Sequence, residues 1–156
     1  MIKAIQMLVD EHVKILAEID SLEKECNKLS TGEEIDKNFF TKKIDFIKNY
    51  ADKFHHAKEE DILFTELCKD SVEMHCNPIP QMLHEHDLGR AFVKGMEEGV
   101  AENDKDKVIK NAIGYAELLR EHIYKEDNIL YPMADEALPE DAQEEMLKKF
   151  EAIKES

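Results

Sequence analysis

Two stretches of the sequence repeat one pattern of side chains that can bind a metal ion. Residues 55–64 read HHAKEEDILF, and residues 122–131 read HIYKEDNILY. In each stretch a histidine precedes a glutamate by four residues, as His55 precedes Glu59 and His122 precedes Glu126. Residues four apart lie on one face of an α-helix, so each pair directs an imidazole nitrogen and a carboxylate to one point. Two such helices facing each other would place two nitrogens and two carboxylates around one buried metal site.

The surrounding residues predict the helices that must hold this pattern. Apolar side chains recur with helical periodicity over four long segments, about residues 2–29, 36–69, 79–101 and 104–135. Pro132 is expected to kink or stop the fourth helix, and Pro139 begins a short fifth one that extends to about residue 154. We expect a single all-α domain over residues 1–156, an antiparallel up-down-up-down four-helix bundle (about residues 2–135) with a short additional C-terminal helix. The extra helix is expected to pack outside the bundle or against a partner.

Two further histidines lie on the apolar stripes of the other helices, His12 on the first and His86 on the third. Counted outward from the predicted turns at about 1.5 Å per residue, His12 and His55 reach nearly the same height along the bundle, and His86 matches His122. A lone histidine on an apolar stripe is more often a core residue than a ligand. One histidine from every helix near mid-bundle is a stronger indication of a shared site.

The two glutamates distinguish a metal site from an ordinary core. Glu59 and Glu126 lie on apolar stripes, and a buried carboxylate without a partner costs several kcal/mol. No lysine or arginine shares these faces. Metal ions between the two carboxylates would remove the conflict, so the six residues together predict metal binding.

The choice between the adjacent residues His55 and His56 follows from helical periodicity. His55 has Ala51 one turn behind it and corresponds to His122 in the second stretch, so it is expected to point inward. His56 has Asp52 one turn behind it, so it is expected to face a polar flank. We expect His56 to form an outer pair with Glu60, beside the ligands.

Other potential ligands are set aside. His84 lies two residues before His86, so the two diverge on a helix and His84 is expected to point outward. His75 lies in a predicted loop and is assigned no role. The three cysteines never form a C-x-x-C pair, which disfavours a disulfide framework or a thiolate zinc site and favours reduced, mostly packed thiols.

The types of ligand side chain limit which metal can bind. Four imidazoles and two carboxylates without a thiolate suit a mid-row transition metal better than calcium or a structural zinc ion. Two glutamates can each bridge two ions, which favours a dinuclear site. Ferritin-like proteins use Glu-x-x-His pairs, and no histidine here has a glutamate three residues before it.

Taken together, these residues resemble the hemerythrin-like, or HHE cation-binding, domain family over residues 1–135. The motifs that carry the resemblance are Asp10-Glu11-His12, His55-x-x-x-Glu59-Glu60-x-x-Leu63-Phe64, His84-Glu85-His86-Asp87 and His122-x-x-x-Glu126-x-x-x-Leu130-Tyr131-Pro132. The resemblance implies a four-helix bundle with a non-haem di-iron centre, two iron ions joined by an oxo or hydroxo bridge. It implies the metal ligands His12, His55, Glu59, His86, His122 and Glu126, with both glutamates bridging.

One departure from the family pattern bears on function. Invertebrate oxygen carriers of this family place two histidines four residues apart on the third helix, whereas Met82 and Arg90 flank His86 at that spacing here. The sequence is more similar to bacterial members with four histidines and two glutamates, some of which are implicated in repairing damaged iron centres.

The ligand count predicts open coordination positions. Six positions on each iron give about twelve, of which the histidines, bridging carboxylates and oxygen bridge fill about ten. Open positions favour binding of, or reaction with, O2, NO or peroxide, in sensing, defence or iron-centre repair. An iron store or donor without turnover is the alternative, and a metal-free structural bundle is a third possibility. The sequence does not decide between a carrier, a sensor and an enzyme, and it leaves the redox partner and the choice of monomer or homodimer open.

Composition excludes several other classes of partner. The formal net charge is −15, so nucleic acid and anionic membrane surfaces are not expected as partners. No run of apolar residues is long enough to span a membrane, and the first residues lack the apolar run of a signal peptide. We therefore expect a cytoplasmic protein.

Overall fold

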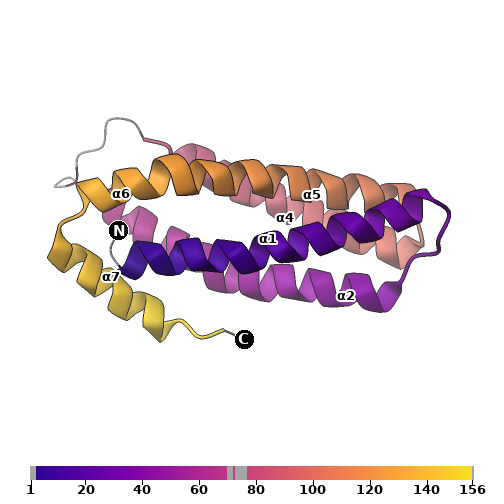
Figure 1. The fold of residues 1–156 in the computed structure, drawn as a ribbon, viewed down its shortest axis with the longest axis horizontal. Coiled ribbons are helices and arrows are strands. Elements are labelled where there is room, and N and C mark those ends of the chain that lie inside the picture. Colours follow the sequence, from indigo (N-terminus) through magenta and orange to yellow (C-terminus); the bar gives the residue numbers. More distant parts are fainter. Residues whose placement is uncertain (1–2, 70–71, 73–76, 156) are drawn as a thin grey trace.

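The computed structural model describes residues 3–69, 72 and 77–155, and within these ranges all regular secondary structure is helical. Helix α1 (Lys3–Ser30), helix α4 (Ile79–Glu102) and helix α5 (Lys105–Lys125) run along the long axis of the molecule, together with the segment that begins with α2 (Lys37–Phe46). These four lengths of helix lie side by side as a bundle (Figure 1). The predicted all-α class is confirmed.

The second helical segment is longer than α2 alone. It continues through η1 (Ile47–His56), η2 (Glu59–Leu63) and α3 (Phe64–Leu67), of which η1 and η2 are π-helical. The carboxylate of Asp36 caps its start by accepting a hydrogen bond from the backbone N–H of Phe39 at 3.1 Å. A π-helix has i→i+5 hydrogen bonds and hence more residues per turn than an α-helix. The sequence predicted the extent of this helix, but not its change of winding.

The fourth helical segment changes its winding in the same way. Helix α5 begins after Asp104, whose carboxylate accepts from the backbone N–H of Lys107, and continues through η3 (Glu126–Leu130) and α6 (Tyr131–Ala137). Pro132 lies in the first turn of α6, directly after the π-turn, where its missing N–H interrupts the helix least. The helix therefore runs past Pro132 to Ala137, close to the predicted end at about residue 135, and of the kink or stop expected at Pro132 the stop does not occur.

Helix α7 (Glu140–Ala152) contacts α1 and η2 and lies across the end of the bundle where α1 begins (Figure 1). Met146 and Phe150 on its inner face are buried. They pack in one apolar cluster with Ile5 and Leu8 of α1. Of the two placements expected for the extra helix, the structure shows packing on the outside of the bundle.

Two separate apolar clusters form the core, and a polar layer lies between them along each helix. On α1, Leu8 belongs to one cluster and Ile15 to the other, with His12 between them. On α4, Met82 and Val93 flank the third-helix histidine in the same way. The packing therefore holds the polar layer from both sides and keeps water from it.

Glycines allow α4 and α5 to approach closely. Alanine substitutions at two of them should have opposite effects on the free energy of unfolding. A Cβ atom at Gly99 would lie 2.9 Å from the backbone nitrogen of Val108, whereas at Gly89 the nearest atoms would be 3.8 Å away, in Leu119 and Tyr115. We expect Gly99→Ala to lower the free energy of unfolding by about 1–3 kcal/mol. Gly89→Ala should raise it by about 0.5–1 kcal/mol, because alanine favours a helix more than glycine does. Urea denaturation of both variants at fixed metal content checks this, and equal destabilisation by both would contradict the packing described.

Candidate metal centre

All six residues that the sequence singled out lie in the polar layer. They come from all four helical segments: His12 from α1, His55 from η1, Glu59 from η2, His86 from α4, His122 from α5 and Glu126 from η3. Each is at most 2% exposed. Together with His56 they form two groups, each with all ligand atoms within 4.8 Å of one another: His12, His55 and Glu126 in one, and His56, Glu59, His86 and His122 in the other. Both groups are built from residues far apart in the chain, and each has side chains of the kind that can hold a metal ion.

Each glutamate lies between a histidine of one group and a histidine of the other. The distances from imidazole Nε2 to carboxylate Oε1 are 3.2 Å for His12–Glu126, 3.3 Å for His122–Glu126, 3.3 Å for His55–Glu59 and 3.8 Å for His86–Glu59. A carboxylate between two ligand sets is placed to bridge two ions. The bridging role expected from the sequence would require such a placement.

The inward-facing polar atoms lack ordinary partners. Both carboxylate oxygens of Glu59 and of Glu126 are buried without a hydrogen-bond partner, as is Nε2 of His55. None of the lysine or arginine ion pairs in the described part of the chain involves either glutamate. Burying two such carboxylates costs several kcal/mol each unless a cation compensates them. The donor set therefore fits metal ions at this place.

The nitrogens of His86 and His122 give a second indication. Their Nε2 atoms are 3.2 Å apart. Two nitrogens bound to one ion at about 2.1 Å, at about a right angle, lie about 3 Å from each other. The pair already has the separation that a shared ion requires.

A carboxylate lies beside the outer nitrogen of each histidine in the layer, within hydrogen-bond distance for all of them except His56. The distances from Nδ1 to the carboxylate oxygen are 2.7 Å for His12–Asp127, 2.8 Å for His55–Glu11, 2.8 Å for His86–Glu60, 2.8 Å for His122–Glu85 and 3.6 Å for His56–Asp52. A neutral imidazole whose Nδ1–H faces a carboxylate presents the lone pair of Nε2 on the opposite side of the ring. Metal-binding histidines in proteins are oriented in this way. This pattern is independent of the ligand spacing and supports the same site.

Basic side chains fix these outer carboxylates. Lys58, which is 1% exposed, pairs with Glu11 at 2.5 Å, and its ammonium lies 3.6 Å from the ring centroid of Phe54. Lys125 pairs with Glu85 at 2.5 Å. Burial raises the pKa of Glu85, but its hydrogen bonds with the neighbouring histidine, glutamine and lysine outweigh burial and lower the pKa to about 2. These carboxylates therefore stay ionised and keep the imidazoles oriented.

Burial leaves most of the imidazoles uncharged. It lowers the pKa of His12 and of His122, and lowers that of His56 to about 3. His55 differs: burial lowers its pKa, but its hydrogen bond with Glu11 and the negative charge of Glu59, 3.3 Å away, outweigh burial and raise it to about 9. A metal ion would take the place of the Nε2 proton of His55. His12, His56 and His122, whose pKa values are lowered, are already in the form that binds metal.

His56 was misplaced by the sequence analysis. It is only 6% exposed, and its ring stacks on that of His86 with centroids 3.9 Å apart. Glu60 accepts from His86 rather than pairing with His56, so the expected outer pair is not formed. The cause is the π-helical winding of η1, which turns less per residue and brings both His55 and His56 to the inner side. In the sequence, the adjacency of His55 and His56 was the only indication that both could face the interior.

The residues set aside in the sequence lie mostly where expected. His84 is exposed on α4. Cys26 is buried and Cys68 is exposed, and both are free thiols. Only the first fits the expectation of packed thiols. His75 and Cys76 lie outside the described residues.

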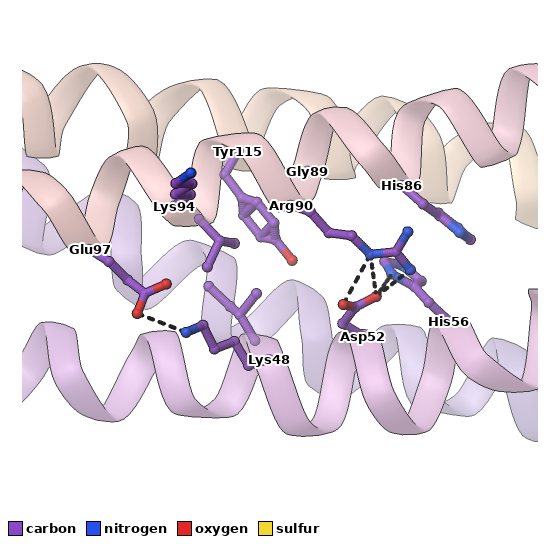
Figure 2. Close-up of a pocket in the computed structure, with 11 residues that line it drawn as sticks. Lys48, Asp52, His56, His86, Gly89, Arg90, Lys94, Glu97 and Tyr115 are labelled. Atoms are coloured by element: carbon purple, nitrogen blue, oxygen red, sulfur yellow. Dashed lines mark hydrogen bonds and ion pairs between the residues drawn. The ribbon is translucent and has the colours of Figure 1, made fainter.

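A cavity of about 130 Å³ opens beside the second metal position, between α4 and the second helical segment (Figure 2). Gly89 and Tyr115 line it, and its inner end reaches His56 and His86. The guanidinium of Arg90 lies at the rim, where it donates hydrogen bonds to Asp52 at 2.8 and 3.1 Å and to Glu60 at 2.6 Å. The cavity gives small molecules a place close to the centre.

The contact between Glu11 and His55 predicts an effect on metal binding. We expect Glu11→Ala to weaken metal affinity about 10- to 100-fold, because it removes the carboxylate that orients His55 and leaves Lys58 buried without its partner. Glu23→Ala is the matched control, since Glu23 lies away from the polar layer and its ion pair among the described residues is a partly exposed one with Arg120. Competition with a chelator of known affinity measures both variants. Equal affinities for the Glu11 variant and the wild type would show that this contact does not matter for the site.

An all-helical chain that gathers histidines and carboxylates from four helical segments into one buried layer has the architecture of a helical-bundle cation-binding protein. Residues 3–134 match the family Hemerythrin, described as Hemerythrin HHE cation binding domain. The chain belongs to this family, and the resemblance drawn from the sequence motifs is confirmed. The comparison with individual curated proteins found no match. Among the described residues, no helix is both long and apolar enough to cross a membrane.

Proposed function

We propose that the protein holds a pair of iron ions and uses it to bind or react with a small oxidant or diatomic gas, namely O2, NO or peroxide. The proposed ligands are the six residues predicted from the sequence, His12, His55, Glu59, His86, His122 and Glu126, with both glutamates bridging. One observation carries the proposal: Glu59 and Glu126 are buried without partners at the points where the histidines converge. Membership of a cation-binding family supports it.

His56 is the seventh group that fits this centre. Its ligand atom lies within 4.8 Å of those of Glu59, His86 and His122. We therefore propose three imidazoles for one ion and two for the other, His12 and His55. The ion with fewer imidazoles then keeps an open coordination position. A pair of iron ions supplies redox chemistry and open positions for an external ligand.

The surrounding residues orient the imidazoles and exclude water from the site. The outer carboxylates hold Nδ1–H of His12, His55, His86 and His122, and the two apolar clusters exclude water from both sides of the layer. The cavity beside His56 and His86 would bring a small molecule to the three-imidazole side of the centre and not directly to the open position. The two short connections at one end of the bundle, residues 31–36 and 103–104, support an up-down-up-down order of the four helical segments.

Metal analysis combined with an optical spectrum tests the proposal. We expect two iron ions per chain and, in the oxidised protein, near-ultraviolet absorption that changes when azide, NO or peroxide is added. Protein purified with iron available that contains no metal would contradict the proposal. Reversible O2 binding for hours without net oxidation would instead identify a carrier.

An iron store or donor is the second candidate from the sequence, and burial argues against it. The seven groups of the centre are at most 6% exposed. Ions held in this way should leave slowly, whereas a donor must release them readily. Rapid loss of iron to a weak chelator would favour the store.

A further inference from the structure

The repeated stretches place an aromatic ring at the same position in each half of the site. Phe64 follows Glu59 by five residues, and Tyr131 follows Glu126 by five. Each is the first residue of the α-helix after a π-turn, and each is buried. The ring of Phe64 lies nearly parallel to that of His86, with centroids 6.1 Å apart, and the ring of Tyr131 lies nearly parallel to that of His12 at 5.4 Å. The side chains at this equivalent position, Phe64 and Tyr131, therefore differ by one hydroxyl group.

The hydroxyl of Tyr131 lies at the inner side of the site. Its Oη is 3.3 Å from Nε2 of His12, the nitrogen that also faces Glu126. The other nitrogen of His12 is already paired with Asp127. A metal ion on Nε2 would use the lone pair that accepts from the hydroxyl. Tyr131, which is 0% exposed, would then hold a buried donor that needs a new acceptor.

The protonation state of Tyr131 suits a donor. A phenol has an ordinary pKa of about 10, so it is protonated at neutral pH and can donate a hydrogen bond. The phenol therefore keeps its proton. Phe64, at the equivalent position, offers no donor to the other half of the site.

We infer that the hydroxyl of Tyr131 donates a hydrogen bond to the external ligand on the ion held by His12 and His55. This rests on the proposed function, which leaves the open position on that ion. The ligand class follows from the donor: a small molecule or anion with a lone pair that can accept a hydrogen bond. The second half of the site, with three imidazoles and a phenylalanine, stabilises no such ligand.

Azide binding to the oxidised, iron-loaded protein tests the inference. We expect Tyr131→Phe to keep the iron content and to bind azide about tenfold more weakly, the effect of losing one hydrogen bond to an anion. The substitution should fold, because the equivalent position already carries a phenylalanine. In resonance Raman spectra, the azide stretch of the wild type should shift between H2O and D2O, and that of Tyr131→Phe should not.

Tyr115→Phe is the matched control. It removes another buried tyrosine hydroxyl, one that lies beside the cavity on the His56 and His86 side. We expect its azide affinity to equal that of the wild type. Weaker azide binding by Tyr115→Phe alone would place the ligand on the other ion and overturn the inference.

The remaining outcomes separate the two proposals. A wild-type protein without iron, or one that is loaded but binds no azide, would overturn the proposed function and this inference with it. Equal azide affinities of the iron-loaded wild type and Tyr131→Phe would overturn only the inference. The same holds if the azide stretch of the wild type does not shift in D2O. In that case the hydroxyl donates to an acceptor within the protein.

Discussion

Glutamine in place of Glu126 is expected to raise the stability of the metal-free protein and to empty the metal site. Both carboxylate oxygens of Glu126 are buried without a hydrogen-bond partner, and the nearest nitrogens are Nε2 of His12 at 3.2 Å and of His122 at 3.3 Å. An amide keeps the shape of the side chain, carries no charge and can donate to these nitrogens. We expect Glu126→Gln to raise the free energy of unfolding of the metal-free protein by about 1–3 kcal/mol.

The same substitution should act in the opposite direction once metal is present. A neutral amide bridges two cations poorly, so Glu126→Gln should lose one or both ions and unfold at a lower temperature than the loaded wild type. Metal analysis and thermal denaturation, each performed on loaded and chelated protein, measure both effects. Glu121→Gln on the exposed side of α5 is the matched control and should change neither. A loss of stability in both states would show that Glu126 has a protein partner and no role as a bridge.

Removal of the metal is expected to cause the largest loss of stability of the wild-type protein. An ion that binds only the folded chain stabilises it by about 4 kcal/mol per site when free metal exceeds the dissociation constant about 1,000-fold. For a chain of 156 residues, each kcal/mol corresponds to about 2–4 °C in Tm. Loss of two ions should therefore lower Tm by about 15–30 °C. Calorimetry before and after chelation measures the shift, and an unchanged Tm would mean that the polar layer is stable without metal.

The affinity for metal should also depend on pH in a defined direction. The pKa of His55 in the metal-free protein is raised to about 9, so below that pH its Nε2 carries a proton that metal must displace. Affinity should therefore rise by about tenfold for each pH unit up to about pH 9 and then level off. Chelator competition between pH 6 and pH 9 measures the slope. Glu11→Ala removes one of the two groups that raise this pKa, so the plateau should begin at lower pH in that variant.

The ligand positions within each helix were predictable because helical spacing is a local property. Four residues separate His55 from Glu59 and His122 from Glu126, and the structure brings each histidine to 3.3 Å of its glutamate. The buried glutamates were equally informative, since an apolar stripe tolerates a carboxylate only with compensation. The helix extents also followed from the sequence, because the residues that cap and break helices act through neighbouring backbone groups.

The error at His56 has a local cause that periodicity cannot reveal. A period of 3.6 residues was assumed along the whole second helix, and η1 departs from it over Ile47–His56. A π-turn is stabilised by what the side chains contact in the folded protein, so its position depends on tertiary packing. The same applies to η3, which carries the helix past Pro132.

The sequence by itself determined that this chain is helical and that one imidazole from each helix and two carboxylates face the interior, because these facts follow from spacing along single helices. Only the tertiary structure decided that a fifth imidazole joins them and which carboxylate holds each outer nitrogen. His12 and Asp127, or His55 and Glu11, are partners from different helices, far apart in the chain. Such pairs depend on how each helix is rotated about its axis, and that rotation is fixed by the packing of the two apolar clusters on either side of the layer.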